Sequence, residues 1–192
     1  MAFWTNTEGL EPKRSYRFTL SIPGSGNDVA GTPNAGIKEF LIEKVKKPGF
    51  AVGESEVKYL NHSFFYPGKV TWDEVTFDII DVLEPQDANG TIQIMKMLQE
   101  AGYEMPEAGS LKTISKAASV KALGRVQIHQ YPASGVKPSE TWVLNGAWIK
   151  QATFGDLDYG SEDMQKVSIT LKYDNAYLEV AGDRNYPSNA KS

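Results

Sequence analysis

The sequence contains no cysteine, and this absence excludes several kinds of chemistry at once. Without thiols the chain can form no disulfide, no structural zinc site of the thiolate type and no cysteine nucleophile. A cysteine-free protein folds in a reducing or an oxidising compartment, so the absence does not locate the protein. At 192 residues, a single domain buries about 70% of the surface of its unfolded chain, so a core needs no covalent support.

Long hydrophobic runs are also missing. No apolar stretch approaches the ~18 residues of a membrane span, and the first residues lack the basic start and apolar segment of a signal peptide. We therefore expect a soluble protein made in the cytosol, with no stable membrane insertion of the monomer. Basic residues are outnumbered, with 20 Lys and Arg against 24 Asp and Glu, so a surface that captures nucleic acid is not expected.

Residues that could carry catalysis or bind metal are few. The only two histidines, His62 and His129, lie in predicted strands without an acidic or histidine partner at ligand spacing. The acidic segment GDLDYGSED (155–163) begins like a calcium loop, but Gly160 and Val167 stand at two positions that need oxygen ligands. The sequence predicts no catalytic residue, no metal site and no cofactor.

Alternation of apolar and polar residues predicts that much of the chain is β-strand. The tight pair Pro67 and Gly68 predicts an antiparallel hairpin between strands at 56–65 and 69–81. Further strands are predicted at 15–22, 39–47, 125–131, 141–151 and 164–173. The residues expected to form the core of these strands are Val75, Phe77, Ile79, Trp148, Val167, Ile169 and Leu171.

Two segments show helical spacing instead. Ile92, Met95 and Leu98, followed by Gly102, predict a helix at 91–101, and a weaker pattern predicts another at 110–123. Seven strands without alternating helices predict a mainly β fold, an antiparallel barrel or sandwich with one or two flanking helices. We expect one domain over residues 1–180 and a flexible polar tail over 181–192.

The order of these features resembles the tail tube proteins of contractile-tailed bacteriophages, a family related to the tube proteins of pyocins and type VI secretion. The resemblance spans residues 16–179. It is carried by SYRFTLSI, FLIEKVKKPG, YPGKVTWDEVTFDIID, a mid-chain helix and finally WVLNGAWIKQATFGDLDYGSEDMQKVSITLKYDNAYLE. Its most specific parts are PGKVTWD and the acidic LDYGSED loop that follows Gly-Ala-Trp.

This resemblance implies a tail-tube-like structural subunit and not an enzyme. Sixfold rings of such subunits would stack into the inner tube of a contractile virion tail, with sheath, baseplate and tail terminator proteins as partners. Phage DNA would be ejected through the lumen without specific binding, and the subunit would be synthesised in the host cytoplasm. The inner tube of a bacterial contractile injection system is an alternative that the sequence does not separate. A small-ligand-binding β-barrel and a glycosidase are rivals from other classes.

In such a tube, the polar face of the strands is expected to line the channel. This hypothesis assigns to the lumen Glu74, Thr76 and Asp78 from one strand, and Ser168, Thr170 and Lys172 from another. An acidic or neutral lining would repel phosphate and let DNA slide, although Lys172 works against this. The alternative is an ordinary solvent-exposed sheet face. Residues 23–38 and 48–56 are candidates for contacts between rings.

Overall fold

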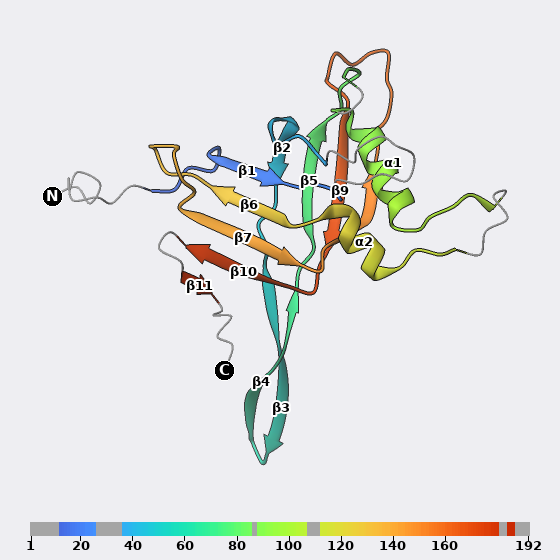
Figure 1. Ribbon diagram of the computed structural model, residues 1–192. Coiled ribbons are helices and arrows are strands. Elements are labelled where there is room, and N and C mark those ends of the chain that lie inside the picture. Colours follow the sequence, from blue (N-terminus) through green and yellow to red (C-terminus); the bar gives the residue numbers. More distant parts are fainter. Residues whose placement is uncertain (1–11, 26–35, 86–87, 107–111, 181–183, 187–192) are drawn as a thin grey trace.

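The computed structural model describes residues 12–25, 36–85, 88–106, 112–180 and 184–186 (Figure 1). In chain order its elements are β1 (Phe18–Ser21), the 3-10 helix η2 (Glu39–Leu41), β2 (Ile42–Val45), β3 (Phe50–Tyr59), β4 (His62–Trp72), β5 (Val75–Ile80), α1 (Gly90–Glu100), α2 (Lys116–Leu123), β6 (Val126–Gln130), β7 (Glu140–Asn145), β8 (Trp148–Thr153), β9 (Lys166–Lys172), β10 (Asn175–Val180) and β11 (Arg184–Tyr186).

Two antiparallel sheets form the body of the protein. One has the strand order β1-β6-β7-β10-β11 and the other β2-β5-β9-β8, while among the described strands β3 and β4 pair only with each other. In Figure 1 the strands of the two sheets cross at a steep angle, as in an orthogonal sandwich. The predicted mainly β, antiparallel, tail-tube-like fold with flanking helices is confirmed.

The hydrophobic core lies between the two sheets. Phe77 of β5 and Ile169 of β9 face each other in register, and each is 1% exposed. The five-stranded sheet contributes Leu20 and Ile128 to the same cluster. Each fully buried side chain of this kind stabilises the fold by about 1.5–3 kcal/mol relative to an exposed one. The side chains at most 1% exposed on β5 and β9 are Val75, Phe77, Ile79, Val167, Ile169 and Leu171.

Helix α1 agrees with its predicted range to within one residue, but it buries a different face. Its N-terminus is capped by Asn89, whose side chain accepts a hydrogen bond from the Ile92 amide at 2.9 Å. Ile94 and Met97 enter the core, whereas Met95, which the sequence pattern placed on the buried stripe, is 45% exposed. Two apolar stripes share this helix, and packing against the sheets decides which one is buried.

Helix α2 is shorter than predicted. Residues 112–115 are not helical, and Ser115 caps the first turn by accepting a hydrogen bond from the Ala118 amide at 3.2 Å. Ser110 and Leu111, at the start of the predicted helix, lie outside the described residues. The cap explains the late start, because a serine that bonds the backbone of the next turn favours the N-terminal position.

The prediction of a hairpin turn at Pro67 and Gly68 is wrong. The register runs from Phe50 opposite Trp72 to Tyr59 opposite His62, so the chain turns at Leu60 and Asn61. Pro67 and Gly68 lie inside β4 at a register shift. A two-stranded sheet consists only of edges, so proline is tolerated there. The true turn carries no glycine, and Leu60 adopts a positive φ of 52° instead, which hid it from the sequence pattern.

The single strand predicted at 141–151 is in fact two strands in different sheets. β7 ends at Asn145, and β8 begins at Trp148 in the four-stranded sheet. Gly146 makes the crossing possible: its φ is +66°, and a Cβ there would lie 2.4 Å from a carboxylate oxygen of Asp174. A side chain here would be strained by the positive φ and would displace the Asp174 carboxylate, so glycine is favoured.

Three further details differ from the sequence prediction. Residues 39–41, at the start of the strand predicted at 39–47, form η2. Strand β10 was not predicted, although it pairs with β7 along its whole length. β11 lies within the segment expected to be a flexible polar tail, and it pairs with β10. The remaining residues of that segment lie outside the described part of the chain.

Candidate channel face and assembly surfaces

The six residues predicted to line a channel lie together on one face of the four-stranded sheet. Thr76 is opposite Thr170, and Asp78 is opposite Ser168. The Ser168 hydroxyl donates a hydrogen bond to Asp78 Oδ1 at 2.6 Å. Glu74 and Lys172 complete this set at the same end of β5 and β9, where Lys172 Nζ is 3.8 Å from Glu74 Oε1. We call this surface, opposite the core side of the sheet, the polar face.

Three more lysines lie on the polar face, two of them on the neighbouring strands β2 and β8. Lys150 of β8 donates a hydrogen bond to Glu74 Oε1 at 2.5 Å. Lys166 of β9 lies 2.8 Å from Glu43 of β2, and Lys44 of β2 is in register with Asp78. The face therefore carries four lysines against three carboxylates. The sequence pointed to Lys172 as a lysine that works against an acidic or neutral lining, and the strand register adds Lys44, Lys150 and Lys166 to the same face.

These ion pairs shift the pKa values of their members. The hydrogen bond from Lys150 lowers the pKa of Glu74, and the charge of Lys172 acts in the same direction. The hydrogen bond to Glu43 raises the pKa of Lys166. Both shifts favour the charged forms of Glu74 and Lys166, so the polar face presents paired charges of both signs.

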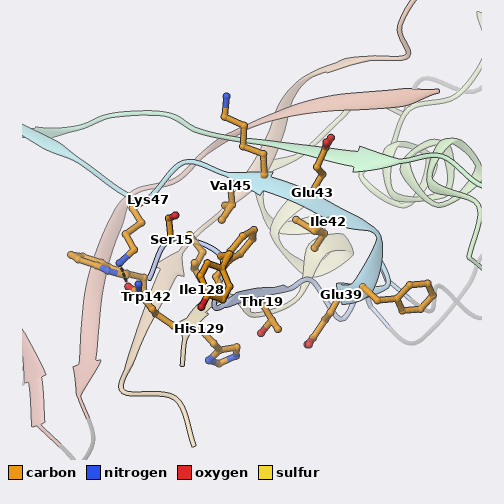
Figure 2. Close-up of a pocket in the computed structure, with 15 residues that line it drawn as sticks. Ser15, Thr19, Glu39, Ile42, Glu43, Val45, Lys47, Ile128, His129 and Trp142 are labelled. Atoms are coloured by element: carbon orange, nitrogen blue, oxygen red, sulfur yellow. Dashed lines mark hydrogen bonds between the residues drawn. The ribbon is translucent and has the colours of Figure 1, made fainter. Parts of the chain in front are cut away.

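The sequence could not show this balance, because cross-strand neighbours decide it. The register shifts between Ile42 and Lys44 on β2, and again between Ile149 and Gln151 on β8. Each irregularity inserts a residue into the alternation, so Glu43 and Lys150 join the polar face beside residues that alternation alone assigns there. In Figure 2, Glu43 points away from the side of β2 that carries Ile42 and Val45.

A groove of about 1030 Å³ opens on one side of the sandwich, between β2, β1 and β6 (Figure 2). β1 and β2 are edge strands of their sheets, so this groove lies where both sheets end. Ile42, Val45 and Ile128 give it an apolar floor, and Glu39, Lys44 and His129 add charged or polar side chains. Phe40 and Tyr16, also in its lining, are 79% and 70% exposed.

An ion-pair cluster fixes one end of this groove. Lys47, which follows β2, donates hydrogen bonds to Gln130 of β6 and to Glu140 of β7, and Lys13 pairs with the same carboxylate. Burial opposes ionisation of Glu140, but the hydrogen bonds from the two lysines outweigh it and lower the pKa of Glu140. The cluster therefore ties the two sheets together at their open edge.

A second, smaller groove of about 350 Å³ lies on the opposite side, between α1, α2 and the edge strand β8. Met95, Leu98, Ile114 and Phe154 line it, and Met95 and Ile114 are about half exposed. Trp148, predicted as a core residue, is half-buried and lines this groove. Its neighbour Ile149 packs against the core instead.

The described residues offer no constellation for catalysis or metal binding. No group of three His, Asp or Glu side chains in the described ranges could hold a metal ion. His62 lies on the β3–β4 hairpin, whereas His129 lies on β6, where its Nδ1 is 2.9 Å from the Thr141 hydroxyl. Burial lowers the pKa of His129, which favours the neutral ring. Neither α1 nor α2 reaches the 18 apolar residues of a membrane span.

The fold is shared with solved structures of other proteins. No family model and no curated protein matches the sequence. Among solved structures, a chain in the cryo-EM structure of the anti-feeding prophage tube-terminating cap aligns over 94% of this chain and 100% of its own length, with a TM-score of 0.61 and 16% identity.

Two chains from an extracellular contractile injection system, PVC, are similar to the same degree. One comes from its sheath/tube terminator in the extended state, with a TM-score of 0.60, 16% identity, and coverage of 90% of this chain and 100% of that one. The other comes from its sheath-tube complex, with a TM-score of 0.58, 15% identity, and coverage of 88% and 93%. At such identities the likeness establishes a shared fold, and this fold agrees with the resemblance to tail tube proteins.

Proposed function

We propose that the protein is a structural subunit of the inner tube of a contractile tail or injection device. The observation that carries this proposal is the four-stranded sheet, which builds the core with one face and leaves a polar face uncovered by any described element. A sheet of this kind is suited to line a water-filled channel. The shared fold with chains from tube, terminator and cap assemblies supports the same function.

Ring formation would join the two sides of the sandwich head to tail. The groove beside β1 and β2 lies on one side, and the α1, α2 and β8 surface lies on the other. Both sides expose apolar residues, such as Phe40 on the first and Met95 on the second. A contact between two different surfaces closes into a ring when its rotation allows, and we expect the sixfold ring implied by the family resemblance.

In such a ring, the polar face points inward. Glu74, Thr76, Asp78, Ser168, Thr170 and Lys172 then line the lumen together with the lysines of β2 and β8. Sheath, baseplate and terminator proteins would contact the outer surface and the ends of the tube. In a phage, the protein would be made in the host cytoplasm and would reside in the virion tail.

The charge of the polar face affects which molecule, DNA or protein, would pass easily through the tube. Phage DNA would slide freely along an acidic lining, but lysines that contact phosphates release counterions and bind DNA. Four lysines against three carboxylates give no excess of negative charge. This balance favours the second candidate, the tube of an injection device that carries protein cargo, over the conduit for DNA ejection.

Assembly is tested by negative-stain microscopy of the purified protein at high concentration. Rings or hollow rods are expected because the sandwich exposes apolar residues on both of its sides. A species that stays monomeric at every salt concentration, with or without seeding by preformed tubes, contradicts the proposal. A monomer with a small molecule in the groove of Figure 2 would instead support the ligand-binding alternative.

The orientation of the polar face is tested by chemical labelling, which the absence of cysteine makes clean. Thr76→Cys places a thiol on the polar face, and Gln127→Cys places one on the outward face of β6, between the buried Val126 and Ile128. In assembled tubes, a bulky polymer-linked maleimide should label the Gln127 variant and spare the Thr76 variant. Equal labelling of both would place the polar face outside.

A further inference from the structure

Methionine is the only sulfur-containing residue type of this protein, since the sequence has five methionines and no cysteine. An oxidant that attacks sulfur therefore meets thioethers and no thiol. Four of the methionines lie in the described residues, and their exposure separates them. Met97 is 1% exposed in the core, whereas Met95, Met105 and Met164 are 45%, 64% and 68% exposed. These last three are accessible to an oxidant in the free subunit.

Met95 differs from the other accessible methionines in its location. It lies on α1 and lines the groove of about 350 Å³ between α1, α2 and β8. The helices α1 and α2 pack against each other (Figure 1), and α2 also packs against β8. Met105 follows α1 and Met164 precedes β9, and neither of these two side chains lines the groove. Oxidation of Met95 would therefore change the chemistry of the groove itself.

Two polar side chains of this groove already have hydrogen-bond partners. The Ser119 hydroxyl donates to a backbone carbonyl at 2.8 Å, and Lys150 Nζ donates to Glu74 Oε1 at 2.5 Å. Among the other described residues that line the groove, only Trp148 and Gln151 carry polar side-chain atoms. A new acceptor atom in this groove would therefore be surrounded mainly by apolar side chains.

We infer that Met95 is a redox-sensitive modification site, and that its oxidation by a peroxide keeps the free subunit out of the ring. The inference rests on the proposed function, in which a neighbouring subunit covers this groove. In the reaction with hydrogen peroxide, the lone pair of the Met95 sulfur forms a bond to one peroxide oxygen. The O–O bond breaks, and the second oxygen leaves as water with both protons. The sulfur is oxidised to a sulfoxide and the peroxide is reduced.

The sulfoxide opposes assembly because it makes an apolar contact polar. A methionine thioether is flexible and apolar, so it adapts to the surface that covers it. The sulfoxide oxygen is a hydrogen-bond acceptor, and burying an acceptor without a donor costs free energy. Assembly in turn removes Met95 from solvent, because the neighbouring subunit covers the groove. Oxidation would therefore act on free subunits and spare finished tubes.

Peptide mapping by mass spectrometry tests the accessibility of Met95. Hydrogen peroxide is applied to free subunits and to assembled tubes, and the sulfoxide at each methionine is measured over time. In free subunits Met95 should be oxidised at least several-fold faster than Met97, which is buried two residues further along the same helix. In tubes the oxidation of Met95 should slow several-fold. Equal rates for Met95 in tubes and in free subunits would overturn the inference.

Negative-stain microscopy tests the effect on assembly. Wild-type subunits that are treated with peroxide and then freed of it should form several-fold fewer rings, and methionine sulfoxide reductases should restore ring formation. Met95→Leu keeps an apolar side chain of similar volume and a good helix former, so it should form rings with or without peroxide. Met164→Leu, the matched change at an exposed methionine outside the groove, should remain sensitive.

The same experiment separates this inference from the proposed function. Met95→Gln, which places a polar side chain of similar length in the groove, should form few rings even without peroxide. If treated Met95→Leu loses rings to the same extent as treated wild type, Met95 is not the sensitive site. Wild-type rings that are unaffected by peroxide refute the inference but not the tube, whereas a lack of rings in untreated wild type refutes the tube.

Discussion

Glu74, which directly precedes β5, accepts a hydrogen bond from Lys150 on β8, at 2.5 Å, across the intervening strand β9. Lys172 approaches the same carboxylate from β9 at 3.8 Å. One acidic side chain therefore lies beside two lysines, and the polar face carries paired charges of both signs where the sequence predicted an acidic or neutral lining. Of the three carboxylates placed on this face, Glu74 is the one that lies beside two lysines.

Replacing Glu74 by lysine should convert the polar face into a DNA-binding surface. The Glu74→Lys variant leaves Lys150 and Lys172 beside a third positive charge, with no carboxylate between them. Assembled tubes should then retain labelled DNA at low salt, and the slope of log affinity against log salt should steepen by about 0.9 for each added phosphate contact. Glu104→Lys, outside the sheet, is the charge-matched control, and equal retention by both variants would contradict the channel assignment.

Acid should weaken the fold through Glu140. Burial opposes its ionisation, but the bonds from Lys13 and Lys47 prevail, so its pKa in the folded state lies below the ordinary value of 4.5. A carboxyl with a depressed pKa stabilises the fold above its unfolded pKa, and this contribution disappears as pH falls through the folded value. The free energy of unfolding should therefore decrease below about pH 4.5.

The Glu140→Ala variant measures how much the Glu140 carboxylate contributes to the free energy of unfolding. At neutral pH it should lose about 1–3 kcal/mol of the free energy of unfolding, because two charged hydrogen bonds are removed. Its stability should also depend less on pH between 7 and 3 than that of the wild type, as measured by urea unfolding. A pH profile parallel to the wild type would show that Glu140 is not the titrating group.

Two neighbouring residues on β5 should differ sharply in their contribution to stability. Phe77 is 1% exposed in the core, whereas Thr76 points to the polar face. Phe77→Ala should cost about 3–5 kcal/mol, since it opens a cavity between the sheets. Thr76→Ala should change stability by about 0.5 kcal/mol or less. Denaturant unfolding of both variants measures the difference, and similar costs would refute the assignment of faces.

Glycine at position 60 should relieve backbone strain in the turn of the β3–β4 hairpin. Leu60 has a φ of 52°, a left-handed conformation that costs a side chain about 1–2 kcal/mol. Leu60→Gly removes this strain, so the amides of Lys58 and Ser63 should exchange hydrogen more slowly, as measured by NMR. Asn61→Gly is the control, because it leaves the strained Leu60 backbone in place and should not slow the exchange. Faster exchange in Leu60→Gly would place the turn elsewhere.

Local sequence patterns predicted those features that depend on the nearest neighbours in the chain. The alternation of Val75, Phe77 and Ile79 marks the buried face of a strand because period 2 is a property of the extended backbone itself. The extent of α1, predicted at 91–101 and observed at Gly90–Glu100, likewise depends on residues within one or two turns. The order of these elements was enough to indicate the tail-tube-like fold.

Features that depend on distant residues required the tertiary structure. The turn at Leu60 was displaced from Pro67 and Gly68 because cross-strand pairing, and not turn propensity, sets the register. The break at Gly146 was not predicted because only two residues separate β7 from β8, and the sequence does not show that the two strands join different sheets.

The polar face shows the same division most clearly. Alternation along the chain places Glu74, Thr76 and Asp78 on one side of the polypeptide, and this pattern needs no partner strand. Only the fold decided that Lys150 and Lys172 stand beside Glu74, because electrostatic balance depends on distance in space and these lysines are far away along the chain. The alternation along the chain thus indicates which side chains are polar and face outward. The order of the strands in the sheet decides which of these charges lie next to one another.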